Sequence, residues 1–298
     1  MTVKTAMNSK KDFDMLALAF ARGVNKTAWG KDSYYILTRD VDYKGEIWIP
    51  LACSKINDNA VAESQKTTVL SPVWKEMFGT GNEYGISYEE FRKTGLNGEA
   101  LNNVLATIAE KSEQAFQGTL DGNGYKISNA KLMFGADLRI INKEAHGNTN
   151  FVGFLGKYGV VKNLTLDNIS FQSYEEAFGS VTEFDKLGDD VTVKATRVRR
   201  SGTEPGLFGF YHGTIKDCKF SFTNRDTLPN TVIQAAYVFL YGGSMTSGRS
   251  ENVIIDVSGL GNFKQIYSNL FIFRAYNQGI SPLKNVYVVS SVEDQAGN

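Results

Sequence analysis

One polar residue that closes a β-rich segment recurs along the chain, and this recurrence restricts the possible folds more than any other feature. The recurring positions are Asn129, Asn163, Asp217, Asn252 and Asn285, at separations of 34, 54, 35 and 33 residues. The separation of 54 is an ordinary repeat lengthened by a polar loop between Gln172 and Ser201. Near-regular repeats with loop-sized exceptions are typical of stacked coils, in which each coil packs on its neighbours. The sequence therefore predicts an all-β solenoid.

Alternating positions in these segments predict which side chains face the core. Two columns of apolar residues recur from segment to segment: Leu164, Cys218, Val253 and Val286, then, two residues on, Leu166, Phe220, Ile255 and Val288. Because neighbouring side chains of a strand point to opposite faces, both columns should be buried. The positions between them should face outward: Thr165, Lys219, Ile254 and Tyr287. Cys218 is then a small buried apolar residue and not a reactive thiol. The Asn/Asp column suits turns in the left-handed conformation, where these side chains cap backbone groups.

The amino-acid composition excludes some classes of protein and of binding partner. Lysine and arginine total 32, as do aspartate and glutamate, so the formal net charge of the 298 residues is zero. A general nucleic-acid binder needs a basic surplus to neutralise phosphates, so no nucleic-acid partner is predicted. The 29 glycines, 19 phenylalanines and 14 tyrosines, against five prolines, favour a turn-rich β protein. Two cysteines, Cys53 and Cys218, are too few for a disulfide-stapled scaffold.

The sequence predicts neither a membrane span nor a signal peptide. No run approaches the roughly 20 apolar residues that a bilayer-spanning helix needs. The apolar stretch 15–21 is short and follows Asp12 and Asp14, which does not fit a signal peptide. If the protein works outside a cell, we therefore expect that its export signal was left off or that it leaves by another route, such as in a virion.

The whole chain, 1–298, is predicted to form a single β-helix domain. Residues 1–52 would form an N-terminal helix cap and the first coil. Ser9 and Asp12 indicate the start of this helix, and its apolar face comprises Phe13, Leu16, Ala17 and Phe20. Residues 53–115 would form a mainly helical insertion, which could build a functional face or pack as a flap on the coils. Residues 116–298 would form the stacked coils, with a long loop at 172–203.

Several motifs in these coils resemble the GLUG-motif repeat family. The Gly-Leu-any-Gly signature is matched at 206–209 and approximated at 153–156. Further matches follow the family's order: Asp40-Val41-Asp42, Trp48-Ile49-Pro50, Phe116 to Asn129 and Val152 to Leu164. The segments 241–243 and 271–273 depart from the Gly-x-x-Gly spacing. The resemblance implies a right-handed parallel β-helix similar to the pectate-lyase-like fold, as in bacterial surface proteins, adhesins and phage-encoded proteins. The motif carries no catalytic residues, so none is transferred here.

No catalytic, metal or cofactor site is predicted. The stretch 121–124 lacks the ligand spacing of a calcium loop and the lysine of a phosphate-binding loop, so it should be a tight turn. His146 and His212 each lie beside glycine and are expected to be solvated turn residues. The carboxylates of Asp167, Asp217 and Asp256 are expected in different columns or turns, which gives no acid–base pair.

Five residues are candidates for binding a partner or a glycan: Arg197, Arg199, Arg200, Tyr211 and Tyr241. The arginines could hold an anionic glycan or an acidic protein patch, or they could pair with the aspartates of their own loop. The tyrosines could stack on sugars or pack within the coil wall.

These observations favour a non-enzymatic structural or adhesive module of a cell surface or virion, such as a capsid decoration, spike or fibre. Its partner would be a protein or a cell-surface or capsular glycan, and a homo-oligomer or larger assembly is compatible with that role. The alternative is a polysaccharide lyase or glycoside hydrolase of the β-helix type, because stacked strands present an elongated groove that suits a polymer.

Overall fold

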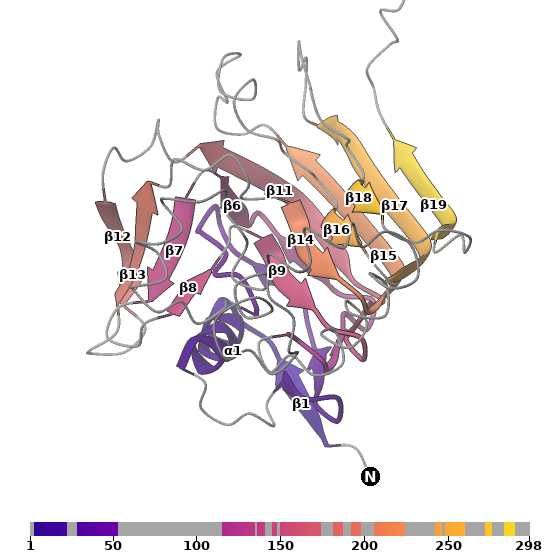
Figure 1. Ribbon diagram of the computed structural model, residues 1–298, viewed down its shortest axis with the longest axis horizontal. Coiled ribbons are helices and arrows are strands. Elements are labelled where there is room, and N and C mark those ends of the chain that lie inside the picture. Colours follow the sequence, from indigo (N-terminus) through magenta and orange to yellow (C-terminus); the bar gives the residue numbers. More distant parts are fainter. Residues whose placement is uncertain are drawn as a thin grey trace, which may run out of the picture.

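The chain runs mostly as β-strands, and most of them pair in parallel (Figure 1). The computed structural model describes residues 3–22, 29–52, 115–134, 136–140, 145–147, 150–173, 181–186, 192–197, 206–223, 242–245, 248–259, 272–275 and 283–289. Parallel sheets and a single described helix confirm the all-β class that the sequence predicts.

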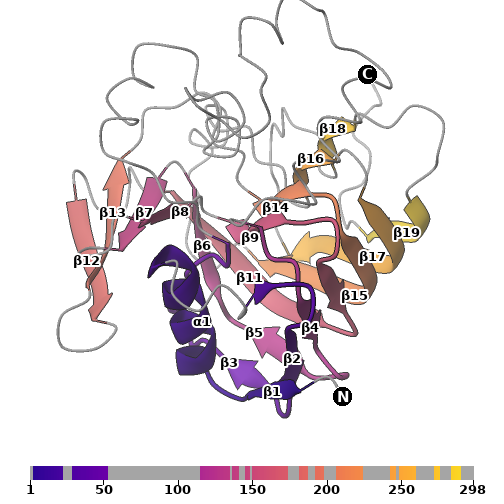
Figure 2. The same ribbon diagram turned by 60° about the horizontal axis from the view of Figure 1, so that its bottom comes forward.

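Helix α1 (Lys10–Arg22) begins where the sequence predicts it. The Ser9 amide donates to Asp12 Oδ2 at 2.9 Å, and the Asp12 amide donates to Ser9 Oγ at 3.4 Å. This reciprocal capping satisfies two backbone donors at the helix start. The predicted apolar face is buried, and the Phe20 ring stacks on Trp29 with centroids 4.4 Å apart. The helix therefore packs into the core beside the first strands of the stack (Figure 2).

The first sheet has eleven strands. One row of parallel neighbours comprises β1 (Lys4–Met7), β2 (Tyr34–Leu37), β4 (Thr119–Asp121), β10 (Val160–Lys162), β15 (Thr214–Thr223), β17 (Arg249–Gly259) and β19 (Leu283–Val289). A second row joins it at β15 and comprises β11 (Thr165–Ser173), β5 (Lys126–Ser128) and β3 (Val41–Asp42), with β6 (Lys131–Phe134) also paired to β11. Strand β15 is long enough to pair with both β10 and β11.

The second sheet is parallel and has four strands. In spatial order they are β9 (Asn150–Leu155), β14 (Gly206–Tyr211), β16 (Gly242–Met245) and β18 (Ile272–Ala275). The chain alternates between the two parallel sheets, because β9, β14, β16 and β18 are each followed by a strand of the first sheet. Phe208 of the second sheet meets Phe220 of the first with ring centroids 6.0 Å apart. The apolar core therefore lies between these two sheets.

The third sheet is antiparallel and combines two distant segments. Strands β7 (Ala136–Ile140) and β8 (Ala145–Gly147) pair with each other, and β12 (Val181–Lys186) pairs with β13 (Thr192–Arg197). Strand β13 then pairs with β7, which joins the two hairpins beside the parallel strands (Figure 1). The segment 172–203 thus contains two strands where the sequence predicts a long loop. His146 likewise lies in β8 and not in the predicted turn.

The register confirms the two predicted core columns. Cys218 pairs with Val253 and Phe220 pairs with Ile255, so equivalent residues stack directly on one another. The members on β15 and β17 are almost fully buried, whereas on β19 Val286 is partly buried and Val288 is 46% exposed. The predicted burial of Val288 is therefore wrong, because β19 lies at the edge of the described sheet. The outward position is confirmed at Ile254 and Tyr287, which are 39% and 61% exposed.

The predicted left-handed turns are present, but the column contains one wrong member. Asn163, Asp217, Asn252 and Asn285 have φ between 50° and 54° and follow one another across neighbouring strands. Asn129 is also left-handed, with φ of 58°, but its neighbour is Asn168, whose Nδ2 donates to Asn129 Oδ1 at 2.6 Å. The alignment of Asn129 with Asn163 was wrong because two turns on this part of the stack use left-handed asparagine.

The predicted helical insertion, 53–115, lies outside the described residues except for Ala115, and so does Cys53.

Candidate functional site

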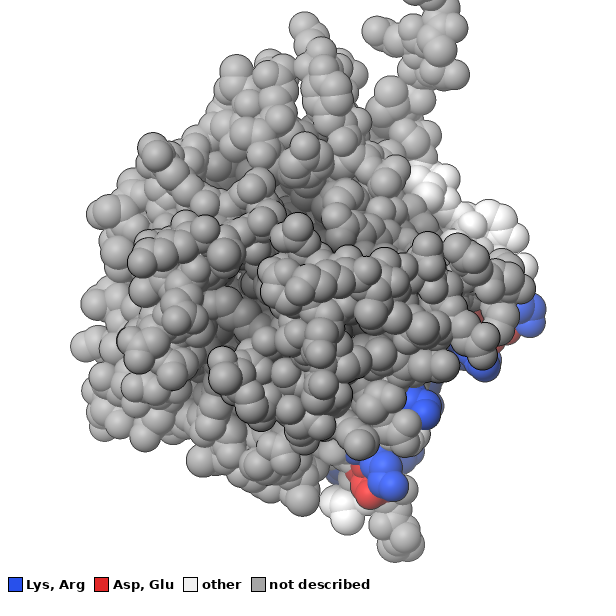
Figure 3. All heavy atoms as spheres, viewed as in Figure 1, with Lys and Arg blue, Asp and Glu red and all other residues white. Residues whose placement is uncertain are grey.

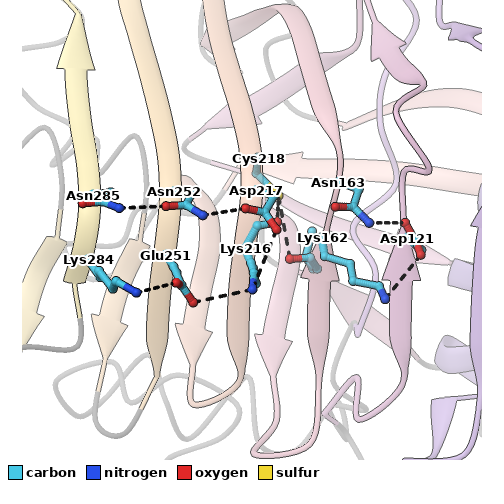
Figure 4. A network of polar contacts seen from close by, with 11 residues as sticks. Asp121, Lys162, Asn163, Lys216, Asp217, Cys218, Glu251, Asn252, Lys284 and Asn285 are labelled. Carbon is cyan, nitrogen blue, oxygen red and sulfur yellow. Dashed lines mark hydrogen bonds and ion pairs between the residues drawn. The ribbon is translucent and has the colours of Figure 1, made fainter.

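A row of charged side chains crosses the outer face of the first sheet on adjacent strands (Figure 4). This charge row consists of Asp121, Lys162, Lys216, Glu251 and Lys284, which the strand register aligns. The Nζ of Lys162 lies 3.4 Å from Asp121 Oδ2, and Glu251 pairs with Lys216 at 3.7 Å and with Lys284 at 2.9 Å. Basic and acidic side chains also lie close together along this side of the molecule in Figure 3. The charge row thus largely neutralises itself.

Asp121 is the most enclosed member of the charge row, at 6% exposure. Its carboxylate accepts hydrogen bonds from the Tyr34 hydroxyl, from Asn163 Nδ2 at 3.0 Å and from the Asn123 amide at 2.9 Å. Burial alone would raise the pKa of Asp121, but these bonds and the Lys162 charge lower it overall. Asp121 is therefore an ionised link between β2, β4 and β10.

The segment that follows is the predicted tight turn. Asn123 and Gly124 have φ of 52° and 81°, and the Tyr125 amide donates to the Gly122 carbonyl at 2.8 Å. Two successive left-handed residues define a turn that favours Asn-Gly. Gly122 is required for a different reason, since a Cβ there would lie 2.3 Å from the carbonyl oxygen of Asn163. Among the described residues, no group of three His, Cys, Asp or Glu side chains could hold a metal ion.

An asparagine ladder runs beside the charge row. Asn285 Nδ2 donates to Asn252 Oδ1 at 3.0 Å, and Asn252 Nδ2 donates to Asp217 Oδ1 at 2.7 Å. Asp217 is the next rung, and a carboxylate side chain has no N–H with which to extend the ladder to Asn163. The amide oxygen of Asn163 lies on the side that faces Asp217 (Figure 4). Two acceptors therefore meet at this step of the ladder.

Replacing Asp217 by asparagine is expected to stabilise the protein by about 0.5–1.5 kcal/mol, the usual net value of one hydrogen bond. The new amide would donate to Asn163 while its oxygen still accepts from Asn252, and asparagine tolerates the φ of 53° at this position. The ion pair that is lost, Lys216 to Asp217 at 4.0 Å, is long and exposed and contributes little. The free energy of unfolding in urea measures the change. Asp217→Ala is the control, and it should destabilise; a loss of stability in both variants would contradict the ladder argument.

A second polar row crosses strands β3, β5, β11, β15 and β17 of the first sheet. It corrects the prediction that Asp167 and Asp256 lie in different columns, whereas Asp217 does lie apart from them, in the asparagine ladder. Asp167 and Asp256 lie in the same row on either side of Ser221, which donates to Asp167 Oδ1 at 3.0 Å and pairs in register with Asp256. Carboxylates two strands apart are separated by about 10 Å. The row continues through Ser128 to Asp42.

The carboxyl groups of Asp167 and Asp256 do not suit acid catalysis. Burial would raise the pKa of Asp167, but hydrogen bonds from Lys126 and Ser221 lower it overall. A hydrogen bond from Ser258 is the main cause that lowers the pKa of Asp256. A glycosidase needs one carboxyl whose pKa is raised so that it can donate a proton. Asp167 and Asp256 instead remain ionised and hold lysines, Lys126 at 3.0 Å and Lys219 at 4.0 Å.

The five predicted binding residues are only partly placed. Arg197 ends β13 opposite Ala136, and Tyr211 ends β14 between β9 and β16, but the side chains of both lie outside the described part of the structure. Arg199, Arg200 and Tyr241 lie outside the described residues altogether. The binding role of all five residues stays a prediction.

Two further side chains have clear positions. Cys218 is a buried free thiol whose pKa is raised to about 12 by burial, which confirms that it is an inert core residue.

His212 was predicted to be solvated, and this is wrong. It is 6% exposed, it meets the Phe154 ring edge-on at 5.4 Å, and burial lowers its pKa to about 3. Neutral His212 therefore belongs to the core at the corner between β14 and β15.

Fold and outer face together define a β protein in which the polar side chains of the two described rows and of the asparagine ladder bind one another. No family model matches the chain, and no solved structure matches it. Over 89 residues, 30% of the chain, it is 36% identical to Halomucin of Haloquadratum walsbyi (strain DSM 16790 / HBSQ001), and it spans about 1% of the length of that protein. No helix among the described residues is long and apolar enough to cross a membrane.

Proposed function

We propose that the chain is a right-handed parallel β-helix of the GLUG-motif kind, and that it serves as a non-enzymatic structural or adhesive module of a cell surface or virion. The observation that carries the proposal is the regular register: successive passages of the chain stack in parallel with common inward columns. Connections between parallel strands of one sheet are almost always right-handed, which supports the handedness.

The chemistry of the outer face supports a scaffold rather than an enzyme. Each resolved pKa shift of an outer carboxyl, at Asp121, Asp167, Glu251 and Asp256, is downward. Their partners are lysines, hydroxyls and amides of the same or neighbouring strands. Such contacts hold strands together, and none of these four described carboxyls is a proton donor of the kind that glycoside hydrolysis requires. A polysaccharide-degrading enzyme remains the alternative, because Asp167 and Asp256 do share one outer row.

The partner would bind where the chain leaves the stack. The connections 135–149, 174–205, 224–241 and 260–271 all run from a strand of the first sheet to a strand of the second. The return connections 156–159, 212–213, 246–248 and 276–282 are shorter. In repeat proteins, insertions gathered on one side often build the binding face. Arg197, Arg199, Arg200 and Tyr241 belong to these connections in the sequence. We propose that the connections contact a protein or a cell-surface or capsular glycan.

The similarity to part of Halomucin, a protein whose name refers to mucins, favours a surface role over an intracellular one. The match covers 30% of this chain and about 1% of Halomucin.

Incubation with a panel of acidic and neutral polysaccharides tests the proposal. We expect binding without chain cleavage, measured by affinity electrophoresis and by the size of the recovered polymer. Replacing Arg197, Arg199 and Arg200 together by alanine should weaken binding to acidic polymers and reduce its dependence on salt. Reproducible cleavage that Asp167→Asn abolishes, and that the matched variant Asp42→Asn leaves intact, would establish the enzymatic alternative instead.

A further inference from the structure

We infer that residues 53–114 are an excursion grafted into a single β-strand, and that the stacked fold forms without them. The strand is divided into two halves, 51–52 and 115–116, which lie along the same neighbour, β9. Leu51 pairs in parallel with Val152, and Phe116 pairs in parallel with Leu155. The chain therefore leaves and re-enters the stack along one strand.

Backbone hydrogen bonds fix both halves. The Leu51 amide donates to Phe151 O at 3.1 Å, and Leu51 O accepts from the Gly153 amide at 2.8 Å. The Phe116 amide donates to Phe154 O at 2.8 Å, and Phe116 O accepts from the Gly156 amide at 3.0 Å. Each half thus has the two-sided bonding of a parallel bridge, and neither bond depends on a residue between 53 and 114.

The spacing of the paired residues on β9 matches the spacing that a direct join would give. On β9, Val152 and Leu155 are three positions apart. If Ala52 were bonded directly to Ala115, Leu51 and Phe116 would also be three positions apart. In a regular extended strand, residues three positions apart face opposite edges. β9 nevertheless bonds to both halves through one edge, first by Phe151 O and the Gly153 amide and then by Phe154 O and the Gly156 amide, so its backbone changes its facing between Gly153 and Phe154. A joined strand of equal length would follow the same change. A direct bond between Ala52 and Ala115 would therefore preserve the register of both halves with β9.

Aromatic side chains of the first 52 residues pack against the second half. Leu51, Ala115 and Phe116 are fully buried, and Ala52 is 4% exposed. The Phe116 ring lies 6.2 Å from Phe20 and 6.1 Å from Tyr35, both of which belong to the first 52 residues. Ala52 has a left-handed φ of 57°, which is unfavourable for alanine and marks the point where the chain turns out of the strand. A direct bond would let Ala52 return to an extended conformation.

Deletion of residues 53–114 in the full chain, with Ala52 joined to Ala115, tests this inference. We expect a circular dichroism spectrum of the β type, a monodisperse species of the reduced mass, and a melting temperature within about 5 °C of the parent protein. A second variant joins Ala52 to Ala115 through two glycines, which allows for local strain at the bond.

The matched control also removes Ala115, so that Ala52 joins Phe116. Phe116 would then lie opposite Phe154 instead of Leu155, so its amide could no longer donate to Phe154 O and its carbonyl could no longer accept from the Gly156 amide. We expect this control to melt at least about 10 °C below the direct deletion. The inference is overturned if neither join yields a folded protein, or if the control is as stable as the direct deletion.

Discussion

Replacing Phe220 by alanine is expected to lower the free energy of unfolding by about 3–5 kcal/mol, the usual range for a large aromatic residue in a core. Phe220 is fully buried on β15, with Leu166 and Ile255 paired to it on the neighbouring strands. Its ring also meets Phe208 of the second sheet at 6.0 Å. Hydrogen bonds hold the flanking strands in place, so the stack cannot collapse into the cavity. Guanidinium unfolding followed by circular dichroism measures the loss.

Val288 provides the control, because it occupies the same column on β19 but is 46% exposed. Val288→Ala should therefore lower stability by about 1 kcal/mol or less. The expected loss of unfolding free energy is smaller at Val288 than at Phe220 because burial decreases along the column. If the two variants lost similar stability, the core would not be organised by these columns.

The core columns could be predicted from the sequence because they depend only on strand periodicity and a nearly constant repeat. The same reasoning failed where pairing joins distant segments. Strand β13 pairs with β7, and the sequence gives no local sign of that partner or register. The position of Asn129 could not be predicted either, because every left-handed turn selects the same residue types and the sequence does not say which turn a given asparagine closes.

The candidate site shows the same limit at the level of single residues. Asp121 was recognised as part of a tight turn, but its partner Tyr34 could not be predicted, because residues 53–114 separate the two in the chain. His212 was expected in solvent because Gly213 follows it. Gly213 is needed instead for close packing, since a Cβ there would lie 2.1 Å from Gly159 O. A glycine beside a polar residue is thus compatible with a buried corner as well as with an exposed turn.

Replacing Asp121 by alanine is expected to lower the free energy of unfolding by at least about 1.5–3 kcal/mol, the range for one hydrogen bond to a charged group. The change removes the acceptor of the Tyr34 hydroxyl and of Asn163 Nδ2, and it leaves Lys162 without its ion-pair partner. These contacts join three strands, of which β2 precedes the 53–114 excursion and β4 and β10 follow it. The loss should therefore be larger than for Glu251→Ala, whose carboxylate is more exposed. Urea unfolding at pH 7 measures both variants.

The dependence of stability on pH distinguishes the contribution of the Asp121 charge from the contribution of its side-chain shape. The folded-state pKa of Asp121 is lower than its unfolded value of about 3.9, so the unfolded chain binds more protons between these two pKa values. The stabilisation by Asp121 is therefore complete above the unfolded pKa and is lost as the pH falls through the folded pKa. Asp121→Asn retains the shape without the charge, so its stability should fall less steeply than that of the parent protein below about pH 4. Tyr34→Phe keeps the ring between Lys4 and Lys162 but removes one donor to the carboxylate, so it should leave an intermediate slope. Parallel acid-unfolding curves for the parent protein and Asp121→Asn would contradict the role of this carboxylate as an ionised link between the strands.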